Sequence, residues 1–237
     1  MAFFQETRPQ REPFLNAPSS VLWLIGVLVA VHMARTLAPT LLSEEILFHL
    51  SFLPARYAPG ALAAAGLPPT NMLEMVGSFL SHIFLHGSFA HLAINCMWLL
   101  AFGPGVARRL GTPRFLAFFF FCGVVAASVH LAVNWGSPAI MLGASGAVAG
   151  LMGAGMRILY GSRHLPFIEN PPLAPIGARP ILFFTASWVA VNLLFGFTSL
   201  GLSDAPIAWA AHLGGYFSGL VTIGMFDRRT RQPVFGI

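Results

Sequence analysis

Two residues of this chain could form a hydrolytic pair inside a membrane. Ser145 lies in the sequence Gly143-Ala144-Ser145-Gly146 at the start of a small-residue apolar segment, and His212 lies near the start of the last apolar segment. Polar and ionisable side chains are expensive to keep in lipid and are usually functional there. Because a histidine can take the proton of a serine hydroxyl, the pair predicts a serine hydrolase whose active site lies below the membrane surface.

The composition is that of a membrane protein. Of the 237 residues, 56% are hydrophobic and 9% are charged, whereas soluble domains carry about 25% charged residues. All 13 basic residues are arginines, and they lie in short loops beside apolar runs without interleaved aromatic residues. The positive-inside rule therefore explains them better than nucleic-acid binding does. Cys96 and Cys122 both lie within apolar runs and are expected to be buried hydrophobic residues.

Six apolar runs predict an all-α fold, a polytopic bundle of six transmembrane helices. They are approximately Val21–Leu37, Phe89–Gly103, Phe115–Val133, Gly146–Tyr160, Ile181–Leu202 and Pro206–Phe226. The first run has no small-residue cleavage site, so it is expected to be a retained span and not a signal peptide. We expect the pair Gly103-Pro104 to break the helix of the second span.

Arginine positions predict the orientation. Only Arg35 and Arg56 of the 13 arginines fall on one side of the spans. Both tails, residues 1–20 and 227–237, are therefore expected in the cytoplasm, on either side of a membrane domain over residues 21–226. Residues 38–88 then form a long external loop, whose prolines and apolar side chains suggest that it is partly embedded in the membrane interface.

Two more polar residues, His91 and Asn95, lie at a depth similar to that of the pair. Counted from the inner charged boundary at about 1.5 Å per residue, all four residues lie roughly 18–25 Å up, in the outer half of a hydrocarbon core roughly 30 Å thick. His91 and Asn95 share a helix face, and with the Ser145 backbone N–H they could donate hydrogen bonds to an oxyanion. The alternative is a structural network that ties the second span to the external loop.

The fourth and sixth spans must approach closely for the serine and the histidine to meet. Both carry small residues at the spacing that lets helix backbones approach in lipid: Gly146 and Gly150 in the fourth, and Ala211, Gly215 and Gly219 in the sixth. Such glycines alone would indicate packing only. A serine at the helix start, level with a histidine, favours catalysis.

Other intramembrane protease chemistries lack their residues. The aspartates, Asp204 and Asp227, lie at span ends, which leaves no buried pair for an aspartyl protease and no acidic residue deep enough for a Ser-His-Asp triad. A Ser-Lys dyad would need a lysine, and the chain has none. Trp188, Asn192 and Phe195 in the fifth span are expected to serve packing.

Three histidines near the second span raise the question of a metal site. His82, His86 and His91 do not follow the H-E-x-x-H spacing of zinc proteases, and no carboxylate lies nearby to complete a site. We therefore expect neither a metal nor a cofactor, and we place His82 and His86 at the membrane interface.

Together these motifs resemble the rhomboid family of intramembrane serine proteases. The resemblance covers about residues 21–226 and is carried by His91-x-x-x-Asn95, Gly143-Ala144-Ser145-Gly146 and Ala211-His212-x-x-Gly215-x-x-x-Gly219. It implies that Ser145 is the nucleophile, that His212 is the general base and then the acid, and that His91, Asn95 and the Ser145 amide form an oxyanion hole. By the same resemblance, Gly143 lets the loop before the serine turn tightly.

The chain departs from the family pattern at one position. Many rhomboids have an aromatic residue four positions after the serine, where it packs against the catalytic histidine, whereas this chain has Ala149. Another aromatic residue, such as Tyr216, could take that place.

We expect an endopeptidase that cleaves transmembrane segments of single-pass proteins near the outer face of a prokaryotic inner membrane. Its partners would be transmembrane substrates and the bilayer, not nucleic acids. Water would enter through an outward-facing polar cavity covered by the loop Ser199–Pro206. Two alternatives stay open. One is a non-catalytic binder of transmembrane helices, against which the retention of Ser145 and His212 argues. The other is a small channel or transporter, against which the lack of charged residues within the spans argues.

Overall fold

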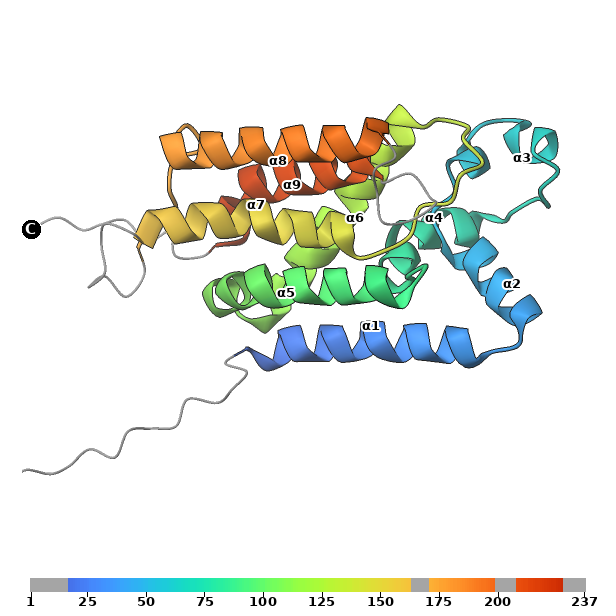
Figure 1. The fold of residues 1–237 in the computed structure, drawn as a ribbon, viewed down its shortest axis with the longest axis horizontal. Coiled ribbons are helices and arrows are strands. Elements are labelled where there is room, and N and C mark those ends of the chain that lie inside the picture. Colours follow the sequence, from blue (N-terminus) through green and yellow to red (C-terminus); the bar gives the residue numbers. More distant parts are fainter. Residues whose placement is uncertain (1–16, 163–170, 199–207, 228–237) are drawn as a thin grey trace, which may run out of the picture.

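The chain folds into a bundle of long helices with a group of short helices at one end (Figure 1). The computed structural model describes residues 17–162, 171–198 and 208–227, so the expected covering loop Ser199–Pro206 lies outside the described residues. Within that part of the chain no strand is present. The elements are α1 (Ser19–Leu37), α2 (Thr40–Leu50), η1 (Pro54–Tyr57), α3 (Ala61–Ala64), α4 (Met72–Ser81), η2 (His82–Phe84), α5 (Phe89–Leu110), α6 (Thr112–Val133), α7 (Ser145–Ser162), α8 (Arg179–Thr198) and α9 (Trp209–Phe226).

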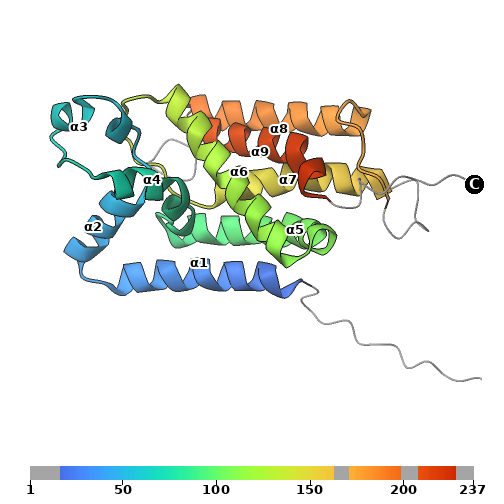
Figure 2. The same cartoon turned by 180° about the vertical axis from the view of Figure 1, so that it is seen from behind.

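Four helices, α1, α5, α6 and α8, are long and apolar enough to cross a membrane by length and composition. The two remaining long helices, α7 and α9, have 18 residues each and are rich in glycine. They lie against each other, α6 packs on both, and α5 packs on α7 (Figures 1 and 2). The fold is thus the expected all-α polytopic bundle, with its two glycine-rich helices packed together.

The expected break in the second span is absent. Helix α5 continues through Pro104 to Leu110, so the prediction that the helix ends at Gly103 was wrong. Proline removes one backbone donor, but the end of the helix is anchored, because Arg109 Nε donates to the Asp227 carboxylate at 2.7 Å. Packing against neighbouring segments outweighs the local preference of the sequence here.

Residues 38–88 pack against the helix bundle and contact the segment that precedes α7. Phe52 and Met141 exchange both of their backbone hydrogen bonds, at 2.9 and 2.7 Å. Phe52 and Ile83 are completely buried, whereas Leu41 on α2 and Leu73 on α4 are about four-fifths exposed. The inner side of this segment therefore supports the core, and its outer side has exposed apolar groups.

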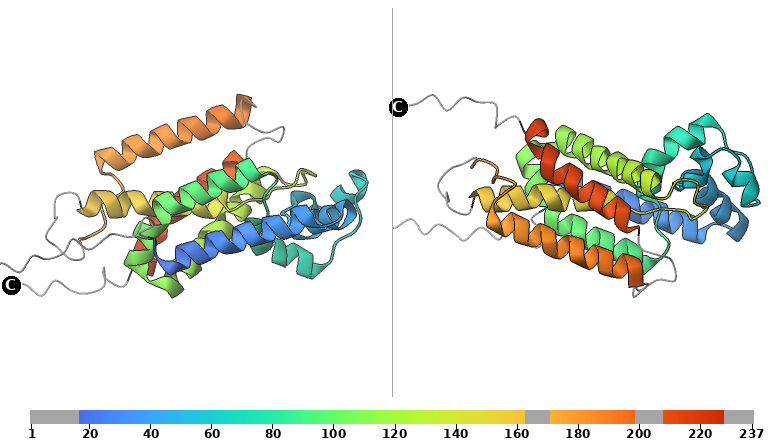
Figure 3. Two further views of the ribbon diagram at one scale, coloured as in Figure 1. Left: turned by 60° about the horizontal axis from the view of Figure 1, so that its bottom comes forward. Right: turned by 90° about the horizontal axis from the view of Figure 1, so that it is seen from above.

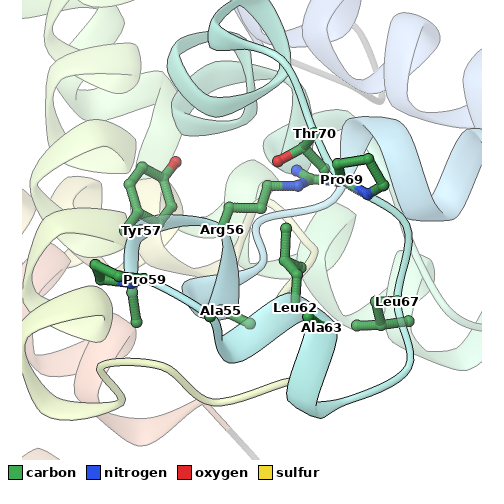
Figure 4. A pocket seen from close by; sticks show the side chains of 11 residues that line it. Ala55, Arg56, Tyr57, Pro59, Leu62, Ala63, Leu67, Pro69 and Thr70 are labelled. Atoms are coloured by element: carbon green, nitrogen blue, oxygen red, sulfur yellow. The ribbon is translucent and has the colours of Figure 1, made fainter.

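A hollow of about 420 Å³ lies within the same segment, between η1 and α3 (Figure 4). Its charged lining residue is Arg56, which is buried and donates to the backbone oxygens of Ser51, at 2.8 Å, and Phe48. Burial lowers the pKa of this guanidinium, and the nearby Glu74 partly offsets that effect. Because these hydrogen bonds tie Arg56 to the loop backbone, we assign it a structural role.

Candidate active site

Ser145 is the first residue of α7. The Ala144 carbonyl accepts the backbone N–H of Val148 at 2.9 Å and so begins the helical hydrogen bonds. The Ser145 N–H belongs to the first turn, whose backbone donors have no partner within the helix. Gly143 precedes the helix with φ +118°, a conformation that favours glycine, and its N–H donates to the His82 carbonyl at 2.9 Å. The segment of residues 38–88 therefore positions the loop that presents the serine.

His212 lies in the first turn of α9 and meets Ser145 directly. Its Nε2 lies 2.8 Å from the serine Oγ, although 67 residues separate the two in sequence. Both side chains are half-buried. The structure thus brings together the two residues that the sequence marks as nucleophile and base, at hydrogen-bonding distance.

Glycines allow this close approach of α7 and α9. A Cβ atom added to Gly215 would lie 1.9 Å from the Gly146 carbonyl oxygen, and one added to Gly219 would lie 1.9 Å from the Gly150 carbonyl oxygen. The backbones of the two helices are therefore in contact at two successive levels. Gly146 and Gly150 also face α6, because their added Cβ atoms would lie within 2.5 Å of side chains on that helix.

Asn192 on α8, which is expected from the sequence to serve packing, is a third member of the site. Its Oδ1 lies 2.9 Å from His212 Nδ1, and the residue is 5% exposed. The interpretation as a packing residue was therefore incomplete, because the side chain makes a specific polar contact. An asparagine in the middle of an apolar span is itself a signal of such a contact, but the sequence does not show which partner it faces.

Tyr216 is directed away from His212. Its hydroxyl lies 2.8 Å from Thr185 Oγ1 on α8, and its ring packs near Phe184 and Trp188. Ala149, at the position of the family's aromatic residue, is buried in the same cluster. The hypothesis that Tyr216 packs against the histidine was wrong, since Asn192 is the residue that contacts the free edge of its ring.

His91 lies beside the serine loop. A Cβ atom on Gly143 would be 2.8 Å from both Cε1 and Nε2 of His91 and 3.9 Å from Ser145 Oγ, so the imidazole lies against the loop that carries the nucleophile. Asn95 is buried one turn further along α5, and its Nδ2 donates to the His91 backbone oxygen at 2.9 Å. One of its two N–H bonds is therefore used within the helix, and the other has no hydrogen-bond partner among the described residues.

His82 and His86 are buried within the packing of residues 38–88 against the bundle. The His82 Nδ1 donates to the Ser78 carbonyl at 2.7 Å, and the His86 ring lies 5.1 Å from the His91 ring. Burial lowers the pKa of His82 to about 4; burial, with His91 and His32 nearby, lowers the pKa of His86 to about 3. Across the described residues, no group of three or more histidine, cysteine, aspartate or glutamate side chains is placed to hold a metal ion.

Comparison with known proteins identifies the family. The Rhomboid domain matches residues 73–229, which is more than half of the chain and includes every residue of the candidate site. The chain belongs to the rhomboid family. Rhomboid protease GluP of Bacillus subtilis (strain 168) is 30% identical over 159 residues, which make up 65% of this chain and 28% of GluP.

Two further rhomboids extend the comparison. Rhomboid protease GlpG of Yersinia pestis (strain Pestoides F) is 31% identical over 163 residues, covering 66% of this chain and 50% of GlpG. RHOMBOID-like protein 5 of Arabidopsis thaliana is 26% identical over 238 residues, covering 91% of this chain and 72% of that protein. The chain thus spans half or less of the length of the two bacterial rhomboid proteases.

Proposed function

We propose that this rhomboid is an intramembrane serine endopeptidase that cleaves transmembrane segments of single-pass membrane proteins. The observation that carries the proposal is the 2.8 Å contact between Ser145 Oγ and His212 Nε2. A serine hydroxyl becomes a useful nucleophile when an adjacent base accepts its proton. Similarity to two proteins named rhomboid proteases supports the same reaction class.

In the proposed reaction, Ser145 Oγ attacks the scissile carbonyl carbon while its proton moves to His212 Nε2. The resulting oxyanion lies near the Ser145 backbone N–H, with the His91 ring and the free N–H of Asn95 as further donors. When the tetrahedral intermediate collapses, His212 gives the proton to the leaving amine. Water then hydrolyses the acyl-enzyme by the same two steps, with His212 again serving as base and acid.

The proposed topology places this chemistry near the outer face of a prokaryotic inner membrane, with both termini in the cytoplasm. Ser145 and His212 lie at the same ends of α7 and α9, toward the part of the molecule that holds α2, α3 and α4 (Figure 1). If the arginine-rich connections are cytoplasmic, this end faces outward. Cysteine-accessibility labelling at residue 60, in the external segment, and at residue 112, at the start of α6, would distinguish this orientation from its inverse.

Labelling with a fluorophosphonate serine-hydrolase probe tests the activity. The parent protein should be labelled, whereas Ser145→Ala and His212→Ala should not be, because each removes one half of the nucleophilic pair. Ser128→Ala is the matched control, since Ser128 donates only to the backbone oxygen of Val124 in α6. Labelling of Ser145→Ala at the parent level would refute the assignment. A folded parent that never labels would favour a non-catalytic binder.

The oxyanion donors have a separate test. His91→Ala and Asn95→Ala should each lower turnover of a cleaved model substrate by up to about 10²–10³ if they donate strongly in the transition state. Asn134→Ala is a suitable control, because Asn134 makes the same kind of bond to the backbone four residues earlier, at the end of α6. Parent-level turnover in both α5 variants would leave these residues a structural role only.

Substrate choice follows from the need to expose a peptide bond. A transmembrane helix keeps its carbonyls in intrahelical hydrogen bonds, so it must unwind before Ser145 can attack. Glycine and proline reduce that cost because both are poor helix formers. We expect cleavage after a small residue with helix-breaking residues downstream, since Gly143 and Gly146 leave a narrow approach. If a uniformly helical, leucine-rich span with unchanged flanks were cut equally fast, unwinding would not be what selects substrates.

A further inference from the structure

Asn192 is a buried polar residue on a largely lipid-exposed helix. Only 11% of the membrane-spanning window of α8 is buried, compared with 39% for α6, and α8 lies at the outer edge of the bundle (Figure 3). Asn192 is nevertheless 5% exposed. Placing an amide in an apolar span is costly unless it is hydrogen-bonded, and polar groups kept there are usually functional.

The hydrogen bonds of Asn192 determine which way its amide points. Its Nδ2 lies 2.9 Å from the Trp188 carbonyl oxygen, and only the NH₂ group of the amide can donate there. The Oδ1 atom must therefore be the one that faces His212 Nδ1 at 2.9 Å. With the amide turned over, two oxygens would face each other at Trp188.

The protonation pattern of the histidine follows from that orientation. Since Oδ1 only accepts hydrogen bonds, Nδ1 of His212 must carry the proton. In the neutral ring, Nε2 then has a free lone pair, and this is the atom 2.8 Å from Ser145 Oγ. Only this tautomer can accept the serine proton, and it is the tautomer that Asn192 stabilises.

We propose that Asn192 is a positioning residue that holds His212 in the tautomer and ring orientation needed to deprotonate Ser145. The inference rests on the proposed protease function. Asn192 takes the place that a carboxylate has in a Ser-His-Asp triad, without placing a charge in the apolar part of the membrane. It also supplies the orientation that an aromatic residue at position 149 would otherwise give.

The test compares two substitutions of Asn192. Asn192→Leu keeps the side-chain size but removes the acceptor, so the fluorophosphonate labelling rate and kcat should fall about tenfold, the worth of one neutral hydrogen bond. KM should stay unchanged, because Asn192 does not touch the substrate. In its protonated form, Asn192→Asp keeps an oxygen acceptor for Nδ1–H and donates its O–H to the Trp188 carbonyl oxygen in place of the amide N–H. It should therefore label faster than the leucine variant, which makes it the rescue experiment.

Thr185→Val is the matched control, because it removes another side-chain hydrogen bond between α8 and α9 without touching the pair. It should label at the parent rate. Equal losses in Thr185→Val and Asn192→Leu, or an aspartate variant as slow as the leucine variant, would reduce Asn192 to helix packing. Should Asn192→Leu not fold, the ratio of the labelling rate of Asn192→Asp to that of Thr185→Val decides whether Asn192 has the positioning role. An unlabelled parent would instead refute the protease itself, so the two failures are distinct.

Discussion

Substitution of Gly215 by alanine tests whether backbone contact between α7 and α9 holds Ser145 and His212 together. The new Cβ would lie 1.9 Å from the Gly146 carbonyl oxygen and 2.7 Å from its carbon. Ordinary van der Waals contact needs about 3.5 Å, so the two helices must separate by about 1.5 Å at this level. Gly146 adjoins Ser145, and Gly215 lies one turn after His212.

The expected effect follows from that displacement. The contact of 2.8 Å between Oγ and Nε2 would lengthen to about 4 Å, which is no longer a hydrogen bond. A displacement of about 1 Å at the reacting groups can cost on the order of 10² in rate. Overpacking alone should lower the free energy of unfolding by about 1–3 kcal/mol. The measurements are the fluorophosphonate labelling rate and thermal unfolding, both in detergent micelles.

Two other glycines provide controls. Gly219→Ala creates the same 1.9 Å overlap, with the Gly150 carbonyl oxygen, but one turn further from the pair. It should lower the free energy of unfolding by a similar amount but slow fluorophosphonate labelling less. Gly26→Ala on α1 meets nothing within 4 Å, so it should leave both properties intact or raise stability slightly. A Gly215→Ala protein that labels and unfolds like the parent would refute the argument.

Three further predictions concern other parts of the molecule. Gly143→Ala should slow labelling strongly while the protein stays folded, because the new Cβ would lie 2.8 Å from the His91 ring on a backbone with φ +118°; parent-rate labelling would contradict this. Asp227→Asn should lower the free energy of unfolding by about 3–5 kcal/mol, because it leaves the buried Arg109 guanidinium without its counter-charge. Chemical unfolding would measure that loss, and Arg109→Met combined with Asp227→Leu should cost less. Burial lowers the pKa of His82 from 6.5 to about 4, so between these pH values the unfolded chain binds more protons than the folded one. Stability should therefore fall as the pH drops below 6.5, by up to about 2 kcal/mol at pH 5, and by less in His82→Gln; equal pH dependence in the two proteins would exclude His82 as a source.

The sequence allowed the spans and the pair to be predicted because lipid penalises polar groups strongly. Ser145 and His212 are conspicuous within apolar runs, and the spacing of Gly215 and Gly219 indicates close helix packing. These signals are local, since each depends on a residue and its near neighbours in one span. They can therefore be recognised in the sequence without any knowledge of how the spans are arranged.

The partner of Asn192 could not be predicted because it depends on which face α8 turns toward α9. Helical periodicity is weak in an apolar helix that is mostly exposed to lipid, so the sequence gives little information on that rotation. The course of α5 through Pro104 had a similar cause. The ion pair that anchors its end joins residues 118 positions apart, and no local rule includes such a contact.

The division of the site among α7, α8 and α9 has a consequence for biosynthesis. When the ribosome has produced the chain as far as α7, Ser145 is already in place, but the proposed base, His212, and the proposed positioning residue, Asn192, have not been made. The hydroxyl is then an ordinary, unreactive alcohol. Only when α9 packs against α7, and Asp227 reaches Arg109, does the serine acquire its proton acceptor. If the chain is the proposed protease, assembly in this order keeps it from cutting neighbouring nascent helices before α9 has been inserted.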